Sequence, residues 1–172
     1  LRHEGAVFLH VSAPAFHDRA GTALLLEAFQ HVRSAVRFIM HGVRDTPGPL
    51  RDVIGNVTID YTGPVADNRD VYPDEADVLV VPRRYGGLAL YAAEGASLGL
   101  PLVTLDLAPL NERPGVLTVP CSHGYETGMV GGQEIVWACD PRLLAQGIDM
   151  LAENPDLVSQ LSTGADEWAA AN

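Results

Sequence analysis

Residues 76–104 read ADVLVVPRRYGGLALYAAEGASLGLPLVT, and this stretch decides the fold. An apolar run at residues 78–81 is followed by a turn that contains glycine and by a helical pattern at residues 90–98. A Gly-Leu-Pro turn then leads into a second apolar run at residues 102–105. Two apolar strands joined by a helix predict neighbouring parallel strands, buried on both faces of a sheet.

The same alternation of apolar runs and helical patterns extends through the rest of the chain. Further strands are expected at residues 6–11, 36–40, 57–61, 116–119 and 135–137. Helices are expected at residues 22–34 and 49–54, and after the N-cap and proline pairs at 140–141 and 154–155. The glycine-rich residues 122–132 are expected to form a loop. The pattern predicts one three-layer α/β/α, Rossmann-like domain with a mostly parallel sheet of about six strands.

The composition is that of one acidic globular domain. The chain has 172 residues and a formal net charge of −11, and all its basic residues other than histidine are arginines. Such a negative field repels nucleic acid, and no basic cluster offsets it, so no nucleic-acid partner is expected. No apolar run is long enough to span a bilayer, and no transmembrane segment is expected. Because the chain begins at Leu1 rather than methionine, we expect it to be part of a longer protein.

The cysteines and histidines show no metal-ligand spacing. Cys121 and Cys139 form no CxxC motif, and two free thiols in a reducing cytosol are expected, with a disulfide as the alternative. Four of the six histidines, at positions 10, 17, 41 and 123, lie in the expected strands and loops, and a structural role is expected for each of these. His10 and His41 end apolar runs, so they are also candidates for contact with a substrate.

In sheets of this kind, ligands bind at the carboxyl ends of the strands. The loops that follow the expected strands are residues 12–21, 42–49, 62–67, 82–89 and 106–112. Gly86 and Gly87 would let a phosphate approach the free N–H groups at the next helix start. Glu94 lies one turn into that helix, where a carboxylate can accept hydrogen bonds from ribose hydroxyls. The alternative is that the glycines form an ordinary turn and that Glu94 is a solvated helix residue.

Residues 76–104 resemble the donor-binding part of retaining GT-B glycosyltransferases of the family-4 type, the glycosyl transferases group 1. That family carries ADV-apolar-P, EGFGL, EA and GLPVV in this order. Residues 8–29 are similar to its FLHVS, RKG and LLEAF motifs, residues 107–112 to the loop after its next strand, and residues 140–161 to its final helices. The resemblance implies that residues 1–172 form the C-terminal, nucleotide-sugar-binding domain of a GT-B fold.

The resemblance also implies substrates, partners and site residues. It implies a UDP- or GDP-sugar donor, no metal or other cofactor, an N-terminal acceptor-binding domain in the same protein, and a cytoplasmic location that is peripheral to the membrane. Glu94 takes the position of the family glutamate that binds the donor ribose. The implied donor-binding residues are Arg19, Gly86, Gly87, Leu88, Ala89, Leu90 and Glu94. No residue is assigned a catalytic role.

Two groups of the family pattern are missing. Gly86 stands where the family has the glutamate that contacts the transferred sugar, and Ala20 stands where it has the lysine that neutralises the donor diphosphate. The family's arginine position falls near Ala15. Arg19 can replace these cations after a small shift, since arginine binds phosphate well, or it is an ordinary surface residue.

Two functions are therefore predicted as alternatives. The first is the donor-binding half of an enzyme that transfers a sugar to a saccharide, lipid or other acceptor with retention of configuration; the isolated half is expected to be inactive. The second is a degenerate GT-B-like binding or scaffold module without turnover, which Gly86 and Ala20 favour. A generic dinucleotide-binding domain ranks last, because no GxGxxG follows the first strand.

Overall fold

The computed structural model describes residues 5–12, 18–43, 50–63, 65, 70–85, 89–129 and 132–172. Its main sheet has seven strands in the order β3-β4-β2-β1-β5-β6-β7. The strands are β1 (Val7–Val11), β2 (Val36–His41), β3 (Leu50–Ile54), β4 (Val57–Gly63), β5 (Val78–Val80), β6 (Leu102–Leu105) and β7 (Val116–Val119). All neighbours are parallel except the antiparallel pair β3–β4, which confirms the mostly parallel sheet.

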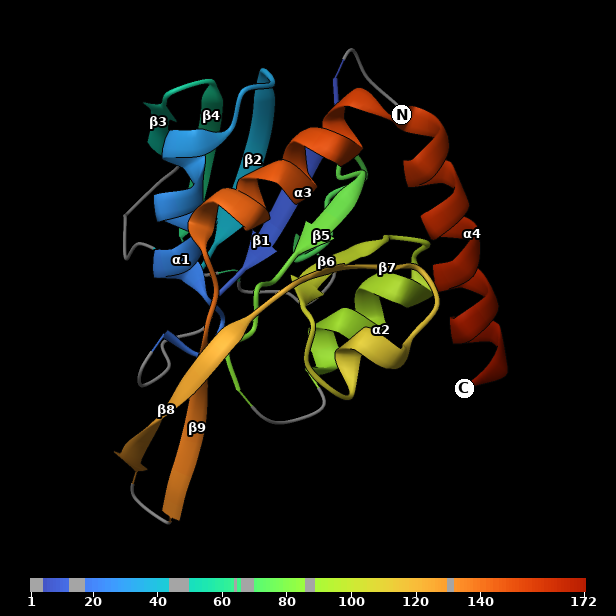
Figure 1. Cartoon of the computed structure of the whole chain (residues 1–172). Coiled ribbons are helices and arrows are strands. Elements are labelled where there is room, and N and C mark those ends of the chain that lie inside the picture. The colour runs from blue at the N-terminus through green and yellow to red at the C-terminus, as the bar shows by residue number, and fades with distance from the viewer. Residues whose placement is uncertain are drawn as a thin grey trace.

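Helices cover both faces of this sheet, and Figure 1 shows α1 and α3 crossing one of them. The helices are α1 (Thr22–Ala28), α2 (Leu90–Ser97), α3 (Pro141–Glu153) and α4 (Pro155–Ala171), with short 3-10 turns at Phe29–His31 and Leu110–Glu112. The side chains of Asp140 and Asn154 cap α3 and α4, so both predicted helix starts are confirmed. None of the helices in the described ranges is long and apolar enough to cross a membrane.

The core consists of two layers, one on each face of the sheet. Phe8 and Phe38 stack 5.1 Å apart between ring centroids, and Phe29 closes over Phe38 at 4.5 Å, on the face of α1 and α3. Leu9 and Ile39 are the next residues along the same strands, and they belong to the other layer, beneath α2. Successive side chains of a strand point to opposite faces, so uniformly apolar strands fill both layers at once.

Three details of the predicted secondary structure were wrong. Residues 49–54 were expected to be helical, but Leu50–Ile54 is the edge strand β3. It pairs with β4 across the two-residue turn Gly55-Asn56, which is a hairpin sequence. The addition of β3 makes the sheet seven-stranded instead of about six. The helix expected at residues 22–34 ends at Ala28 and continues only as a 3-10 turn.

The third error concerns residues 122–132, which were expected to form a loop. They include strand β8 (Ser122–Met129), which pairs with β9 (Gly132–Ala138) in an antiparallel hairpin. Figure 1 shows this hairpin extending away from the main sheet, beyond the carboxyl ends of its parallel strands. Glycines in a strand interior normally indicate a break, and the pairing with β9 overrides that local preference.

The exposed edge of β3 carries a protective contact. Val53, which is 61% exposed, donates its backbone N–H to Oδ1 of the preceding Asp52 at 2.8 Å. Residues of an antiparallel pair turn their N–H groups toward and away from the partner strand in alternation, and the carboxylate of Asp52 occupies the N–H of Val53. A charged group on an edge strand is a common means of preventing unwanted strand pairing.

Candidate functional site

Two loops at the carboxyl end of the sheet are in direct contact. Backbone N–H of Arg84, which follows β5, donates to the carbonyl of Arg19, which follows β1, at 3.2 Å. Gly21 has a φ of +75°, and a Cβ at this position would lie 2.1 Å from the carbonyl oxygen of Pro82. Only glycine allows both this backbone conformation and this close approach. The sequence therefore brings together residues 18–21 and 82–85, which lie in two of the loops predicted to bind the donor.

Three arginines belong to the two segments of this junction. The guanidinium of Arg19 lies 5.4 Å from the ring centroid of Tyr85. Arg83 is 8% exposed, and it donates from Nε to the carbonyl of Tyr85 and from Nη1 to the hydroxyl of Tyr91, each at 3.0 Å. Arg84 lies 4.0 Å from the carboxylate of Asp18. In a chain of net charge −11, this is a local concentration of cations suited to an anion.

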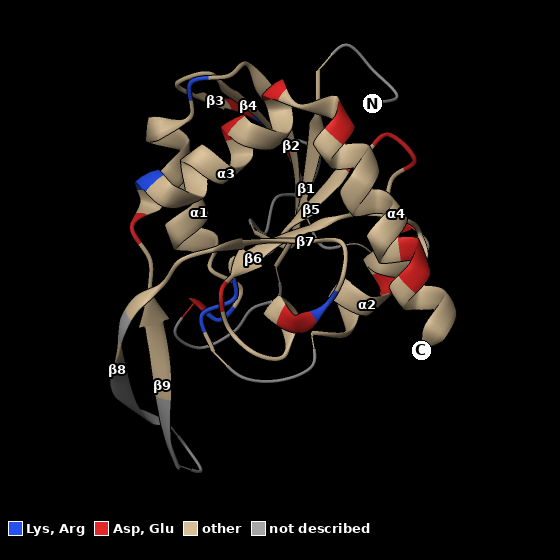
Figure 2. Ribbon diagram, turned by 45° about the vertical axis from the view of Figure 1, so that its right-hand side comes forward, with Lys and Arg blue, Asp and Glu red and all other residues tan. Residues whose placement is uncertain are grey.

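Acidic residues and arginines lie on different parts of the domain. Figure 2 shows acidic residues spread along α3 and α4, whereas arginines appear in the loops beside the base of the hairpin. Sequence reasoning named Arg19 and missed Arg83 and Arg84. The signal was present, because two consecutive arginines directly follow a buried strand and Pro82, where ligands bind in such sheets.

The start of α2 lies next to the junction. Ala89 precedes the helix with a φ of +48°, in the left-handed region, and no side chain caps the first turn. The family pattern has glycine at the position of Ala89, and the positive φ gives the reason, since this conformation costs an L-residue about 1 kcal/mol. Leu90 begins the helix and is 70% exposed. Gly86, Gly87 and Leu88 lie outside the described residues.

Glu94 lies in the second turn of α2, and its side chain is oriented by Tyr72. The hydroxyl of Tyr72 lies 2.8 Å from Oε2 of Glu94 and 2.9 Å from the carbonyl oxygen of Tyr91. Burial, and next the hydrogen bond with Glu94, raise the pKa of Tyr72 above its ordinary value, so the phenol stays a donor. An ionised carboxylate accepts several hydrogen bonds, so this contact still allows Glu94 to bind a ligand hydroxyl. No sequence motif pointed to Tyr72, because it lies in the segment between β4 and β5, 22 residues away from Glu94 in the chain.

His10 has a structural environment at the end of β1. It is fully buried; Nδ1 lies 2.8 Å from the carbonyl oxygen of Val80, and Nε2 lies 2.9 Å from Oγ1 of Thr22. A carbonyl can only accept, so Nδ1 carries the proton, and Nε2 accepts from the threonine hydroxyl. Burial lowers the pKa of His10 to about 4, and the ring is neutral at pH 7. The ring therefore ties β1, β5 and α1 together, as expected for a structural histidine.

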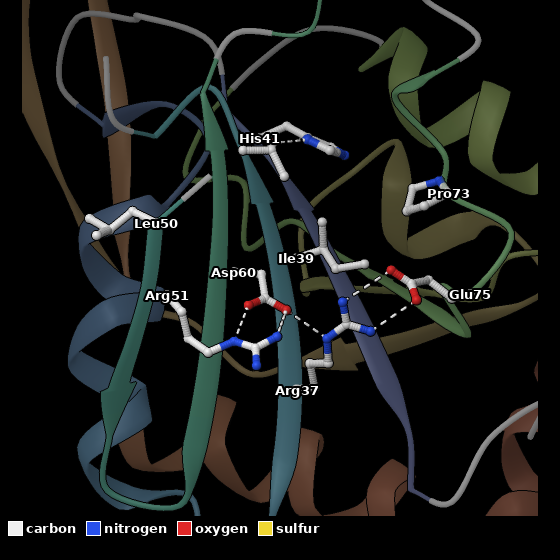
Figure 3. A pocket seen from close by; sticks show the side chains of 9 residues that line it. Arg37, Ile39, His41, Leu50, Arg51, Asp60, Pro73 and Glu75 are labelled. Carbon is white, nitrogen blue, oxygen red and sulfur yellow. Dashed lines mark hydrogen bonds and ion pairs between the residues drawn. The ribbon is translucent and has the colours of Figure 1, made fainter. Parts of the chain in front are cut away.

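His41 lines a separate pocket of about 580 Å³ on the sheet face over β2 and β4. Figure 3 shows its charged residues: Arg37 donates from Nε to Asp60 at 2.7 Å and from Nη1 and Nη2 to Glu75 at 3.0 and 3.1 Å. The bond from Arg51, with Arg37 assisting, holds the pKa of Asp60 below its ordinary value. Nδ1 of His41 forms a hydrogen bond with the hydroxyl of Thr62. The charges of this pocket are thus paired with one another on the sheet face, and the pocket shares no lining residue with the junction of residues 18–21 and 82–85.

The hairpin is attached to the arginine junction by two hydrogen bonds between Trp137 and Arg84. Trp137 in β9 donates its N–H to the carbonyl of Arg84 at 2.9 Å, and Nε of Arg84 donates to the carbonyl of Trp137 at 3.1 Å. The base of the hairpin is therefore part of the candidate site. Within the described ranges, no group of three or more His, Cys, Asp or Glu side chains is arranged to hold a metal ion.

Comparison with known proteins identifies the family of this chain. The family model described as glycosyl transferases group 1 matches residues 5–154. No curated protein matches the chain.

Several solved structures share the fold. Sucrose-phosphate synthase from Thermosynechococcus elongatus is 20% identical with a TM-score of 0.69, over 97% of this chain and 41% of that one. Anabaena HepE, solved with UDP and glucose, is 14% identical with a TM-score of 0.66, over 98% and 44%. S. aureus TarM, solved as a mutant with UDP and other ligands, is 17% identical with a TM-score of 0.69, over 100% and 34%. The chain thus spans less than half the length of each of these three proteins.

Proposed function

Because the chain belongs to the group 1 glycosyl transferases, we propose that it is the donor-binding half of a GT-B enzyme. The enzyme moves a sugar from a UDP- or GDP-sugar to an acceptor, with retention of configuration. An N-terminal domain of the same protein holds the acceptor, and the enzyme works in the cytoplasm, at the membrane surface if the acceptor is a lipid. The observation that carries the proposal is the junction of residues 18–21 with residues 82–85, two segments that contribute Arg19, Arg83 and Arg84.

The donor diphosphate lies at this junction in the proposed complex. Ala20 cannot neutralise a phosphate, but the arginines on either side of the junction can, and each charge-assisted hydrogen bond contributes about 1.5–3 kcal/mol. The first turn of α2, which no side chain caps, adds N–H groups and the positive end of the helix dipole. UDP in the complex of Anabaena HepE supports the choice of a nucleoside diphosphate.

The donor ribose is bound by Glu94 in this proposal. Its carboxylate accepts from the ribose hydroxyls while Tyr72 fixes its orientation. Orienting a carboxylate in advance reduces the entropy lost on binding.

Replacing Glu94 by alanine should weaken binding of UDP or GDP to the full-length protein about tenfold to a hundredfold, because charge-assisted hydrogen bonds are lost. Isothermal titration calorimetry measures the change. Tyr72→Phe should have a smaller effect in the same direction, since the carboxylate remains. The matched control is Glu27→Ala, which removes an exposed glutamate of α1 and should leave the affinity unchanged. An unaltered affinity of the Glu94→Ala variant would show that Glu94 does not bind the ribose.

Restoring the family lysine should strengthen donor binding. We expect Ala20→Lys to tighten UDP or GDP binding about tenfold, the scale of one added charge-assisted contact. The gain should shrink as salt rises, because part of it is screened Coulomb attraction. The nucleoside without phosphate should show no gain. If Ala20→Lys has no effect while Arg19→Ala abolishes binding, then Arg19 already neutralises the diphosphate.

The isolated chain should transfer no sugar, because a GT-B site is completed by a second domain. The measurement is product formation from UDP- and GDP-sugars by the chain alone and by the full-length protein. Turnover by the chain alone would refute the half-site proposal.

A binding module without turnover is the second candidate, and it is favoured by Gly86 at the family glutamate position and by Ala20. It predicts that the full-length protein binds donor but neither transfers nor hydrolyses it. The two candidates are separated by assaying full-length turnover under conditions in which calorimetry shows the donor bound.

A further inference from the structure

The two cysteines of the chain meet at the base of the hairpin. Ser122 in β8 pairs with Ala138 in β9, and this is the last pair of the ladder before the hairpin joins the domain. Cys121 directly precedes Ser122, and Cys139 directly follows Ala138. Continuing the register of the hairpin by one pair therefore sets the two cysteines opposite each other. Opposite residues of antiparallel strands have Cα atoms about 4.5–5.5 Å apart, within the range of about 4.4–6.8 Å that a disulfide needs.

The two side chains also share one side of the hairpin. Both pack against the same hydrophobic cluster, the one beneath α1 and α3, and both remain partly exposed. They are close enough for the charge of Cys121 to affect the titration of Cys139. Their present hydrogen bonds are weak ones to backbone carbonyls: Cys121 to Asp106 at 3.7 Å and Cys139 to Asp140 at 3.3 Å. Little is therefore lost if the two sulfurs turn toward each other.

We propose that Cys121 and Cys139 form a reversible disulfide that cross-links the base of the β8–β9 hairpin, made by exchange with a small-molecule disulfide such as oxidised glutathione. The thiolate of Cys121 attacks one sulfur of glutathione disulfide, whose S–S bond breaks and releases one glutathione thiolate. Cys139 loses its proton to solvent and attacks Sγ of Cys121, which releases the second glutathione. Two protein thiols are oxidised, and one glutathione disulfide is reduced to two thiols.

The environment of the thiols sets the rate and the order of these steps. Burial raises the pKa of Cys139 to about 11, and burial followed by the charge of Asp106 raises that of Cys121. Little thiolate is present at pH 7, so the exchange is slow there and accelerates as pH rises. Stabilised thiolates favour the reduced form of a dithiol and so make its disulfide easier to reduce. The environment of Cys121 and Cys139 disfavours their thiolates, so it does not shift the equilibrium away from the disulfide.

The cross-link acts beside the candidate site. Trp137 lies two residues before Cys139 and exchanges backbone and side-chain bonds with Arg84. A disulfide would hold β9 in place against Arg84 and prevent the two strands from separating at their base. This inference does not depend on the proposed donor, because its measurement involves no nucleotide.

The test is incubation of the chain with oxidised glutathione, then alkylation of free thiols and mass spectrometry. We expect one product that has lost two hydrogens, resists alkylation at both cysteines, and gives a cross-linked peptide containing Cys121 and Cys139; dithiothreitol should reverse it. Its rate of formation should rise about tenfold from pH 7 to pH 8, with the thiolate fraction. Amide exchange in β8 and β9 should slow at least about tenfold in the oxidised form.

Single variants complete the test. Cys139→Ser should stop at the glutathione adduct of Cys121, and Cys121→Ser should react slowly, since burial raises the pKa of Cys139 to about 11 and leaves little thiolate. Two separate glutathione adducts on the unaltered chain, or two cysteines that stay open to alkylation at pH 8, would overturn the proposal. Thermal unfolding of each variant before oxidation shows that the comparison is made between folded proteins.

Discussion

Replacing Asp149 by alanine should lower the free energy of unfolding by about 3 kcal/mol, the largest loss expected from a single polar side chain outside the site. Asp149 lies in α3 and is 2% exposed. Its Oδ1 accepts from the backbone N–H groups of Arg33 at 3.0 Å and Ser34 at 2.9 Å. These donors lie between the 3-10 turn after α1 and the start of β2. Alanine would leave them without an acceptor, and each unsatisfied donor costs about 1–3 kcal/mol.

The titration of Asp149 agrees with this role. Burial acts to raise its pKa, but the hydrogen bonds from Ser34 and Arg33 together outweigh it, and the pKa lies below its ordinary value. The carboxylate is therefore the form that the fold stabilises, and this contribution is lost at acid pH as the group protonates.

Arg33→Ala is the matched control for Asp149→Ala. The Arg33 side chain forms an ion pair with Asp149 at 3.2 Å but is 76% exposed, so the pair contributes less than about 1 kcal/mol. Truncation of Arg33 keeps its backbone N–H. Urea unfolding should thus show a large loss for Asp149→Ala, an intermediate loss for Asp149→Asn and almost none for Arg33→Ala. Equal losses in the two alanine variants would mean that the ion pair, and not the backbone donors, is what matters.

Acidification from pH 7 to pH 4 should cost the native chain about 3 kcal/mol through His10 alone. Its pKa is about 4 in the fold and about 6.5 when the chain is unfolded, so the unfolded state binds more protons between these values. The stability that a neutral His10 supports is complete above pH 6.5 and declines as pH falls toward 4. Each unit of difference between the folded and unfolded pKa corresponds to about 1.36 kcal/mol of stability.

His10→Gln isolates this contribution, because glutamine does not titrate. Urea unfolding at pH 7 and pH 4 gives the loss of unfolding free energy on acidification for each protein. The contributions of carboxylates such as Asp60 and Asp149 cancel when the loss of the variant is subtracted from that of the native chain. We expect the native chain to lose about 3 kcal/mol more than the variant. Parallel pH profiles would show that His10 does not keep its neutral form in the fold.

The parallel part of the fold was predictable from the sequence because its strands are apolar throughout. Apolar periodicity and the Asp140-Pro141 and Asn154-Pro155 pairs were sufficient for β5, α2, β6 and the two final helices. The edge strand β3 was missed although Gly55-Asn56 is a recognisable hairpin turn. Polar residues in β3 interrupt the apolar pattern, since this edge strand is largely exposed.

The candidate site was predictable only in part, since its contacts join residues that are far apart in the chain. Loop positions after β1 and β5 follow from the rule for parallel sheets, whereas Arg19 was named from the family resemblance, because it stands beside the family's lysine position. Tyr72 orients Glu94 across 22 residues of sequence, and Trp137 reaches Arg84 across 53. No local pattern encodes either pair. The pairing of Cys121 with Cys139 likewise depends on the register of a hairpin whose glycines suggested a loop.

The carboxylate that occupies the outward N–H of Val53 limits how this domain can assemble. A second copy, or a foreign peptide, that approached β3 to extend the sheet would have to displace Asp52 and leave that charge dehydrated between two backbones. Oligomers built as a continuous sheet are therefore disfavoured at this edge. If the protein forms dimers, we expect their contacts on helices, with the open side of β3 still facing water.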